Sequence, residues 1–495
     1  MLKGEIVDQE KKDYKKESIG YTEDVDIPGF DYDGSSHTKK DDYILKLRKS
    51  DRINIHVRTS GEDIDEEEHK KREYFNKIVD EAASASQLEQ GTPMQEAEGS
   101  LLYRIWSRVN KESPQPKDHV EKKVEYIELF YDLIFVFSLR TINAMFHVYE
   151  ETFPPAESIL TFVFLTAVVM QVWMFTTMFF NRYGRKALRD YISIFVNMYL
   201  LYYMATGSNI YWLDHYNRYH TAWALIMLNL AYRSWDKMRF APKLDDLDRE
   251  ILKNNVVILA FEFALIVASI PIHYYTGIVI SPVALIVGYV GKLKEHAVYD
   301  KRPCDFPHFA ERNLLLVILT FGEMIIGISG FFSEGDHILL NILSFLIVIG
   351  MFLSYGFFYD NVLDHHKKTS GLGYLVIHVI MILGINSTTI ALELLARPLI
   401  PVFPKTMWMV LTMFVYYICL ISTERYAKEQ LKMDFASMVK IGILLAGYIG
   451  LMLLAGHNQL LGAIITVIFV FGIFFMLLHR HNIRLKEMKV GGYIE

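Results

Sequence analysis

The chain has 495 residues, of which 52% are hydrophobic and 14% aromatic, and its mean hydropathy is positive. This composition argues against a soluble globular protein, because many apolar runs reach the roughly 20 residues that a membrane-spanning helix needs. Negative charge is concentrated in the N-terminal quarter, where residues 1–120 contain 20 Lys and Arg against 27 Asp and Glu.

Residues 1–120 are predicted to form an acidic, partly disordered extension on the cytoplasmic side. No signal peptide is expected, because residues 1–10 lack an apolar segment. The stretch "SLLYRIWSRVN" predicts a helix at 100–110, with one apolar face formed by Leu101, Leu102, Ile105, Trp106 and Val109. Two interpretations of this face stay open: binding to an anionic membrane surface, or packing on the extension's own core.

The rest of the chain predicts an all-α polytopic membrane protein with about twelve transmembrane helices. The fifth and sixth of these helices are expected to be separated only by Pro271. The predicted bounds are Ile127–Tyr149, Ser158–Phe180, Tyr191–Trp212, His220–Trp235, Ile251–Ile270, Ile272–Val290, Phe309–Phe331, Ile338–Tyr359, Tyr374–Leu395, Val402–Ile421, Phe435–Gly456 and Leu460–Leu478.

The loops between these helices predict the orientation of the chain. Cytoplasmic loops of membrane proteins are enriched in Lys and Arg. With the N-terminus inside, the cytoplasmic loops carry about 24 basic residues and the outer loops about three. We therefore expect both termini in the cytoplasm and, since the sequence shows no other address, a location in the plasma membrane.

Similar segments recur in the two halves of the membrane region. "TTMFFNRYGRKALRDYISIF" joins the second and third helices, and "SYGFFYDNVLDHHKKTSGLGYLVI" joins the eighth and ninth. Each segment has a Phe-Phe pair followed by a basic loop. We expect two parallel six-helix repeats, 124–300 and 301–485, related by an axis along the membrane normal, followed by a cytoplasmic tail at 486–495.

The first predicted helix carries a polar stripe. At about 100° per residue, its five polar residues fall within one third of the helix surface. A charge at the bilayer centre costs at least about 2.5 kcal/mol, so this stripe is expected to face protein or water rather than lipid. The five residues are Glu128, Asp132, Arg140, Asn143 and His147.

The seventh predicted helix has a similar stripe, formed by His308, Glu311, Arg312 and Glu323. Glu128 and Arg140 have the same spacing as Glu311 and Glu323. In two related halves these positions lie at equal depth. We therefore predict an ion pair, or a shared hydrogen-bond network, between Arg140 and Glu323.

Functional and structural roles compete for these residues. Glu128 and Glu311 lie in the first turn of their helices, where a negative charge also stabilises the helix N-terminus, so both interpretations stay open. Asp132, Arg140 and Glu323 lie deeper, where ionisable groups tend to mark ion or proton pathways. We place the transport pathway at Glu128, Asp132, Arg140, Glu311, Arg312 and Glu323.

Further candidates are isolated polar residues in other helices. Glu262 lies mid-helix with no charged neighbour in sequence, so it is expected to be protonated or paired across helices. Asn197, His378, Asn386 and Glu393 are more typical of hydrogen bonds that join helices. We retain His308, Glu262, His378, Asn386 and Asp360 as secondary site candidates.

No metal, cofactor, nucleic acid or catalytic site is expected. His308 and Glu311 form only half of a carboxylate metal motif, and the histidines of "DHH" at 364–366 are interpreted as solvated. The sequence has no Walker loop, nucleophile elbow, HExxH or Gly-rich dinucleotide motif. We therefore expect a protein that is not an enzyme, with the lipid bilayer and an unknown small solute or ion as its partners.

Two segments resemble the signature regions of the bacterial low temperature requirement A family. They are "ELFYDLIFVFSL" in the first helix and "HFAERNLLLVILTFGEMIIGI" in the seventh; "ALIMLNLAYRSW" and "FFYD" fit as well. The resemblance covers about Val124 to Leu478 and implies a polytopic membrane protein without a settled biochemical activity. It carries over Glu128, Asp132, His308, Glu311, Arg312, Gly322 and Glu323. Met324 departs from the small polar residue that the motif implies next.

A more distant similarity of plan connects the chain with the lysosomal two-repeat potassium channels. Their first helix carries a Phe-Ser-Asp motif, and this chain has Phe130-Tyr131-Asp132. The sequence leaves three function classes open: an ion-coupled transporter, which we rank first, a cation or proton channel, and a membrane-anchored sensor or scaffold for the extension.

Overall fold

The computed structural model describes residues 123–184, 188–241, 244–329 and 338–490, all of which belong to one packed unit. They form thirteen α-helices and no strand, apart from one isolated bridge between Leu363 and Ala427. Nine of these helices are long and apolar enough to cross a membrane, so the chain is an integral membrane protein. The predicted extension at 1–120, with its helix at 100–110, lies outside the described residues.

The helices fall into two sets separated by a short helix, α10 (His296–Asp300). The first set consists of α4 (Tyr126–Asn143), α5 (Ala156–Tyr183), α6 (Leu188–Ala205), α7 (Tyr216–Phe240), α8 (Asp246–Thr276) and α9 (Ser281–Lys294). The second set consists of α11 (Phe306–Ser329), α12 (Ile338–Phe357), α13 (Leu372–Leu395), α14 (Val402–Ser422), α15 (Phe435–Ala455) and α16 (Gln459–Val490).

Pro271 does not separate two helices, so the predicted boundary there is wrong. Helix α8 runs through Pro271 to Thr276. A proline removes a single backbone hydrogen bond, and membrane helices tolerate that loss when neighbouring groups compensate for it. The chain instead turns at Gly277, whose φ of 71° is a left-handed conformation that favours glycine.

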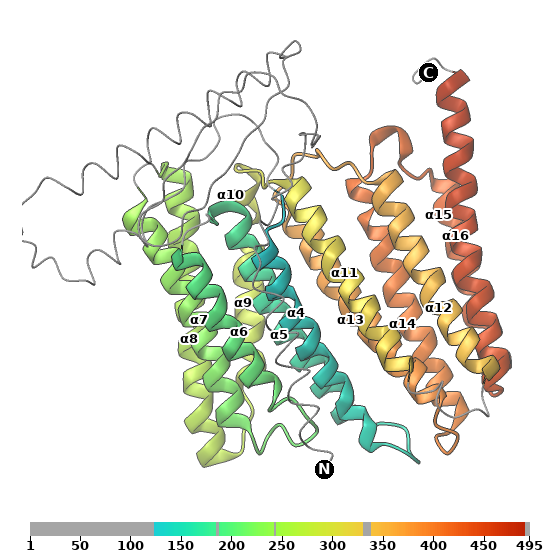
Figure 1. The fold of residues 1–495 in the computed structure, drawn as a ribbon, viewed down its shortest axis with the longest axis horizontal. Helices are drawn as coiled ribbons and strands as arrows, with labels where there is room; N and C mark the ends of the chain where they lie inside the picture. The colour runs from blue at the N-terminus through green and yellow to red at the C-terminus, as the bar shows by residue number, and fades with distance from the viewer. Residues whose placement is uncertain (1–122, 185–187, 242–243, 330–337, 491–495) are drawn as a thin grey trace, which may run out of the picture. The chain divides into compact units, whose positions relative to one another are not determined.

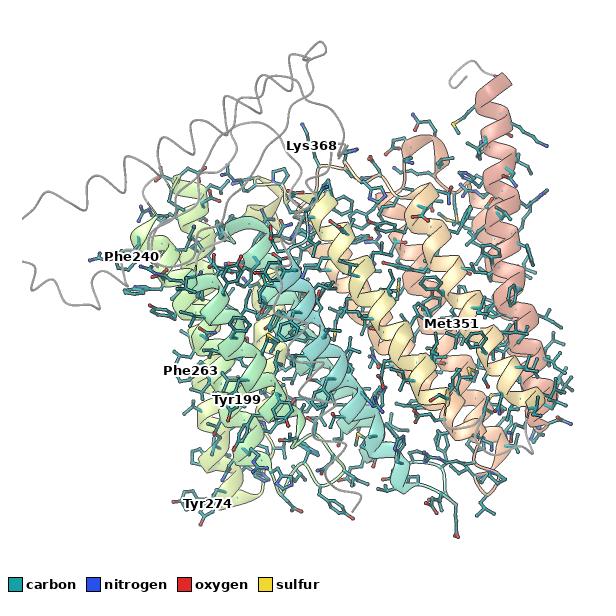
Figure 2. All side chains as sticks on the ribbon, in the orientation of Figure 1. Tyr199, Phe240, Phe263, Tyr274, Met351 and Lys368 are labelled. Carbon is teal, nitrogen blue, oxygen red and sulfur yellow. The ribbon has the colours of Figure 1, made fainter. Side chains whose placement is uncertain are left out.

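Burial distinguishes central from peripheral helices. The apolar windows of α5 and α13 are the most buried, while those of α8 and α15 are mostly exposed. Helices α4 and α11 lie side by side in the middle of the bundle, and α4 begins on the same side as α16 ends (Figure 1). Exposed aromatic side chains such as Tyr199 and Tyr274 project outward from the first set (Figure 2), as expected of a lipid-facing surface.

The two helix sets meet along a small number of elements. Helix α4 packs against α11 and α13, and α5 packs against α13 and α11. The polar stripes predicted on the first and seventh helices therefore belong to elements in direct contact.

Candidate functional site between helices α4 and α11

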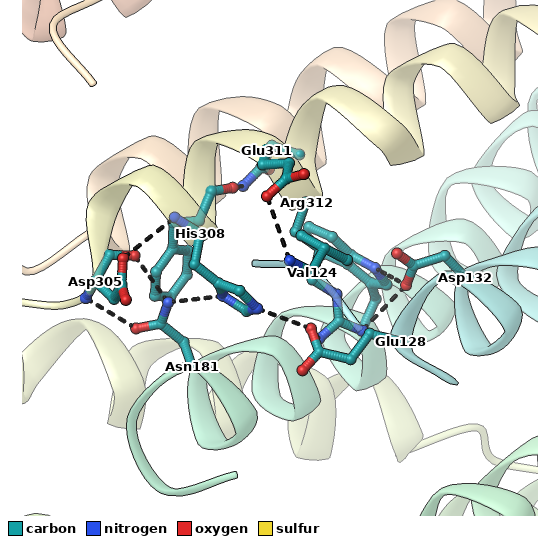
Figure 3. Close-up of polar contacts among 11 residues, drawn as sticks. Val124, Glu128, Asp132, Asn181, Asp305, His308, Glu311 and Arg312 are labelled. Carbon is teal, nitrogen blue, oxygen red and sulfur yellow. Dashed lines mark hydrogen bonds and ion pairs between the residues drawn. The ribbon is translucent and has the colours of Figure 1, made fainter. Parts of the chain in front are cut away.

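A buried ion-pair cluster joins α4 to α11 close to the starts of both helices. The guanidinium of Arg312 lies 3.3 Å from Glu128 Oε2 and 3.1 Å from Asp132 Oδ1. Arg312 and Asp132 have no exposed surface, and Glu128 is almost fully buried. The spacing of four residues places both carboxylates on one face of α4, so a single Arg reaches both (Figure 3).

Helix α5 adds a tryptophan to this cluster, which is called the inner cluster below. The indole N–H of Trp173 donates to Asp132 Oδ1 at 2.9 Å, and the Arg312 guanidinium lies 5.9 Å from the Trp173 ring centre. The indole therefore both fixes the carboxylate and covers the cation. Sequence reasoning missed Trp173, because it lies in a nearly uninterrupted apolar run where tryptophan ordinarily serves as packing.

His308 extends the cluster toward the loop before α11. Its Nε2 lies 3.0 Å from Glu128 Oε2, and its Nδ1 lies 3.0 Å from the Asn181 amide nitrogen. Asn181 also donates to the Asp305 carbonyl and accepts from the Asp305 N–H. Asn181 was not predicted either; the sequence signal for it is an amide at the end of an otherwise apolar helix.

Glu311 lies apart from this ion-pair cluster. It is half-buried, and its carboxylate accepts a hydrogen bond from the backbone N–H of Val124 at 3.3 Å. That contact fixes the segment that leads into α4, which favours the structural interpretation of Glu311. Glu128 contacts both Arg312 and His308.

A second cluster joins the same helices nearer their C-terminal ends. Arg140 Nε lies 3.5 Å from Glu323 Oε1, so the predicted ion pair is confirmed. His147 pairs with Glu393 of α13 at 3.1 Å. The Asn143 amide donates a hydrogen bond of 3.0 Å to Asn386. The residues Arg140, Asn143, His147, Glu323, Asn386 and Glu393 are called the outer cluster below.

The outer cluster is more exposed than the inner one. Glu128, Asp132 and Asn143 are buried, but the side chains of Arg140 and His147 are each 56% exposed. The predicted stripe is therefore buried only in part.

Glu393 contributes more than the single interhelical hydrogen bond expected of it. It pairs with His147, and its charge also acts on Glu323. A Cβ at Gly327 would come within 2.8 Å of Glu393 Oε1, so this glycine on α11 makes room for the carboxylate. The sequence could not reveal this approach, since Gly327 and Glu393 are far apart along the chain.

Mostly apolar side chains separate the two clusters. The buried residues between Asp132 and Arg140 are Phe135, Ser138 and Leu139, and the Ser138 hydroxyl donates to its own helix at Ile134. On α11, Thr320 likewise donates to Leu316. Both hydroxyls are satisfied within their helices, so they do not connect the clusters by hydrogen bonds.

The charges of the two clusters have opposite arrangements. In the inner cluster α4 supplies the carboxylates and α11 supplies Arg312 and His308. In the outer cluster α4 and its 3₁₀ turn supply Arg140 and His147, while α11 and α13 supply Glu323 and Glu393. Each end of the α4–α11 interface is therefore closed by charge pairs that a separation of the helices would break.

The other candidates lie outside these clusters, except Asn386. Glu262 is buried among α5, α8 and α9. His378 is buried and contacts the Tyr374 carbonyl and the Tyr355 hydroxyl, which favours a structural role. Asp360 is exposed and lies just beyond the end of α12. Gly322 faces open space, because a Cβ there would meet no neighbouring atom. Within the ranges that the structure describes, no three His, Cys, Asp or Glu residues form a group able to hold a metal ion.

Comparison with known proteins identifies the family. The model of the bacterial low temperature requirement A protein matches residues 123–474, which include both clusters. No curated protein and no solved structure matches the chain. The chain belongs to the bacterial low temperature requirement A family.

Proposed function

We propose that this protein is an ion-coupled membrane transporter, in which the inner and outer clusters between α4 and α11 act as alternately opening gates. The substrate is a small solute or ion, and the protein is not an enzyme. The observation that carries the proposal is the pair of oppositely arranged charge clusters at two depths of one helix interface. Alternating access requires two gates, because one end must stay closed while the other opens, and the two clusters are placed to serve as these gates.

The packing of the two helix sets supports a repeat of six helices. In each set the first helix packs on the second and third, the third on the fourth, the fourth on the fifth, the fifth on the sixth, and the second on the sixth. With α6, α7 and α9 counted as membrane helices, the chain crosses the bilayer twelve times. Contact between the halves involves α4 and α5 against α11 and α13, which departs from strict two-fold symmetry.

In the proposed orientation the protein spans the plasma membrane, and both of its termini lie in the cytoplasm. An even number of crossings returns the chain to the side on which it started, and α4 begins on the side of the bundle on which α16 ends (Figure 1). The basic connections after α5, α12 and α14 lie on that side, in agreement with the enrichment of Lys and Arg in cytoplasmic loops.

The proposal is tested by flux in liposomes. Purified protein is reconstituted with a pH-sensitive dye inside, and a proton gradient and a membrane potential are imposed while a panel of small solutes is offered. We expect proton movement that depends on one solute and saturates with its concentration. Single-channel current steps would instead identify the cation or proton channel.

A matched pair of variants makes this assay specific. Arg312→Gln disrupts the inner cluster, and Arg302→Gln removes an exposed Arg that pairs with Asp245 and Asp248 at the surface. Solute-dependent flux should fall at least tenfold in the first variant and stay near the parent level in the second. An absence of flux for every solute, with cellular activity that depends on residues 1–120, would favour the sensor or scaffold.

A further inference from the structure

A second buried carboxyl lies in the first helix set, away from the α4–α11 clusters. Glu262, near the middle of α8, has no exposed surface. Helices α5 and α9 enclose it, through Gln171 and Gly288. An ionised carboxylate in such a place is very costly unless a cation or several donors compensate for it.

Gly288 leaves the space that this carboxyl occupies. A Cβ built on Gly288 would collide with Glu262 Oε2 and with the amide nitrogen of Gln171. Any residue larger than glycine at position 288 would therefore displace the Glu262 carboxyl, the Gln171 amide or both. The carboxyl and the amide lie against the same backbone position, so they are within reach of each other.

The polar atoms around Glu262 are acceptors in excess of donors. The Gln171 amide nitrogen donates to the Leu285 carbonyl at 3.2 Å. Within the described part of the chain, neither Glu262 oxygen meets a donor at hydrogen-bond geometry, and Gln171 Oε1 has no partner. The second N–H of the Gln171 amide lies near Glu262 Oε2, but the carboxylate and amide oxygens can only accept, so a proton on Glu262 adds the donor that Gln171 Oε1 lacks.

Few other charges act on Glu262. Lys292, one turn after Gly288 on α9, is the cation whose charge reaches it, and Tyr289 lies nearby. On α5 the neighbouring polar group is Gln171, and the middle of α7, 221–231, contains no ionisable residue. The Lys292 ammonium is held by Glu295 and by the Tyr299 hydroxyl, each at 3.2 Å, at the end of α9.

We propose that Glu262, with Gln171 and Gly288, is a proton-binding site within the membrane. In the loaded state the Glu262 hydroxyl donates to Gln171 Oε1. When the proton leaves for the aqueous phase, the charge of Lys292, one turn away on α9, compensates the new carboxylate while Lys292 keeps its contact with Glu295. The use of this proton in coupling rests on the proposed transport function; the binding site itself does not.

Infrared difference spectroscopy of the full-length protein in liposomes tests this site without any transport. A protonated carboxyl gives a carbonyl band that a carboxylate lacks, so a pH titration reports the loss of the proton. We expect one such band to disappear in Glu262→Gln and to persist in Asp360→Asn, a control at an exposed carboxyl. In Gln171→Leu the band should move to higher frequency, because its hydrogen bond is lost.

The outcomes separate this proposal from the transport proposal. A band of unchanged intensity in Glu262→Gln would overturn the site, as would an unchanged frequency in Gln171→Leu. The second variant decides the matter if Glu262→Gln does not fold, because it leaves the carboxyl in place. The band together with an absence of flux in the liposome assay would reject transport and retain the site.

Discussion

Arg312 shows how one residue can hold several buried charges. It lies between Glu128 and Asp132 with no exposed surface, and His308 and Trp173 contact the same carboxylates. Desolvation of such a group offsets much of its Coulomb attraction, so a buried ion-pair cluster is a poor device for stability alone. The proposed gate would use this balance, since the charge pairs between α4 and α11 would break and form again.

Removal of the Arg312 charge should destabilise the protein strongly. Arg312→Gln leaves two carboxylates buried without their cation, which costs about 3–5 kcal/mol of unfolding free energy. Arg302→Gln, at an exposed ion pair, should cost less than about 1 kcal/mol. Unfolding in mixed micelles measures both. Equal losses in the two variants would show that the Arg312 cluster is not desolvated.

A companion variant checks the cause of that loss. Neutralising Glu128 and Asp132 together with Arg312 removes the unpaired charges as well as the cation. The triple variant should therefore be more stable than Arg312→Gln alone, although it contains more substitutions.

A glycine beside Glu262 offers a second prediction at this scale. Gly288→Ala forces a methyl group into the space of the carboxyl and should cost about 1–3 kcal/mol, as overpacking does. Gly442→Ala is the control, because a Cβ there meets no neighbouring atom. Alanine is also the better helix former by about 0.5–1 kcal/mol, so the control should be neutral or stabilising. Thermal unfolding in detergent compares them, and equal midpoints would contradict the close packing at Gly288.

At the scale of elements, α4 carries opposite charges at its two ends and so complements its partners twice. Its early carboxylates meet Arg312 of α11, and Arg140 near its end meets Glu323 of α11. The mostly apolar segment between them keeps the two clusters separate. One helix interface can therefore loosen at one end while the other end stays bonded.

The Arg140–Glu323 pair allows a charge-exchange test of this complementarity. Arg140→Glu or Glu323→Arg alone places like charges together and should lower stability by about 1 kcal/mol, a modest value because Arg140 is half exposed. The double exchange restores opposite charges and should recover most of the loss, as a coupling energy in a double-mutant cycle. A double variant with purely additive losses would mean that the two side chains do not interact.

At the scale of the whole molecule, two helix sets meet along a narrow interface with a charge cluster at each end. Distances between spin labels can follow the two ends separately. Exposed positions on both sets provide an inner pair, Phe240 with Phe435, and an outer pair, Tyr275 with Leu454. Cys304 is expected to stay unlabelled, because burial raises the pKa of its thiol to about 12.

Each gate variant should then open one end only. Arg312→Gln should lengthen the inner distance and leave the outer one unchanged, and Arg140→Gln should do the reverse, because each removes the Arg–carboxylate pairs at one end. Double electron–electron resonance in liposomes measures both distances. A change of both distances together, or of neither, would contradict the gate mechanism.

Much of the architecture follows from the sequence, because helix formation in a membrane depends on local hydropathy. The long apolar runs predicted the helices, and equal spacing predicted the Arg140–Glu323 pair. The predicted helix boundary at Pro271 was wrong. Neighbouring groups can compensate for the backbone hydrogen bond that a proline removes, and the local sequence does not reveal those neighbours.

The sequence by itself determined that this is a helical membrane protein, which helices carry charge and which family it belongs to. Only the tertiary structure decided which charges meet. It brought Trp173 and Asn181 to the inner cluster, moved Glu311 to a backbone contact and gave Glu393 to His147. The physical reason is that hydropathy acts residue by residue along a helix, whereas the pairing of charges depends on the depth and rotation at which separate helices pack.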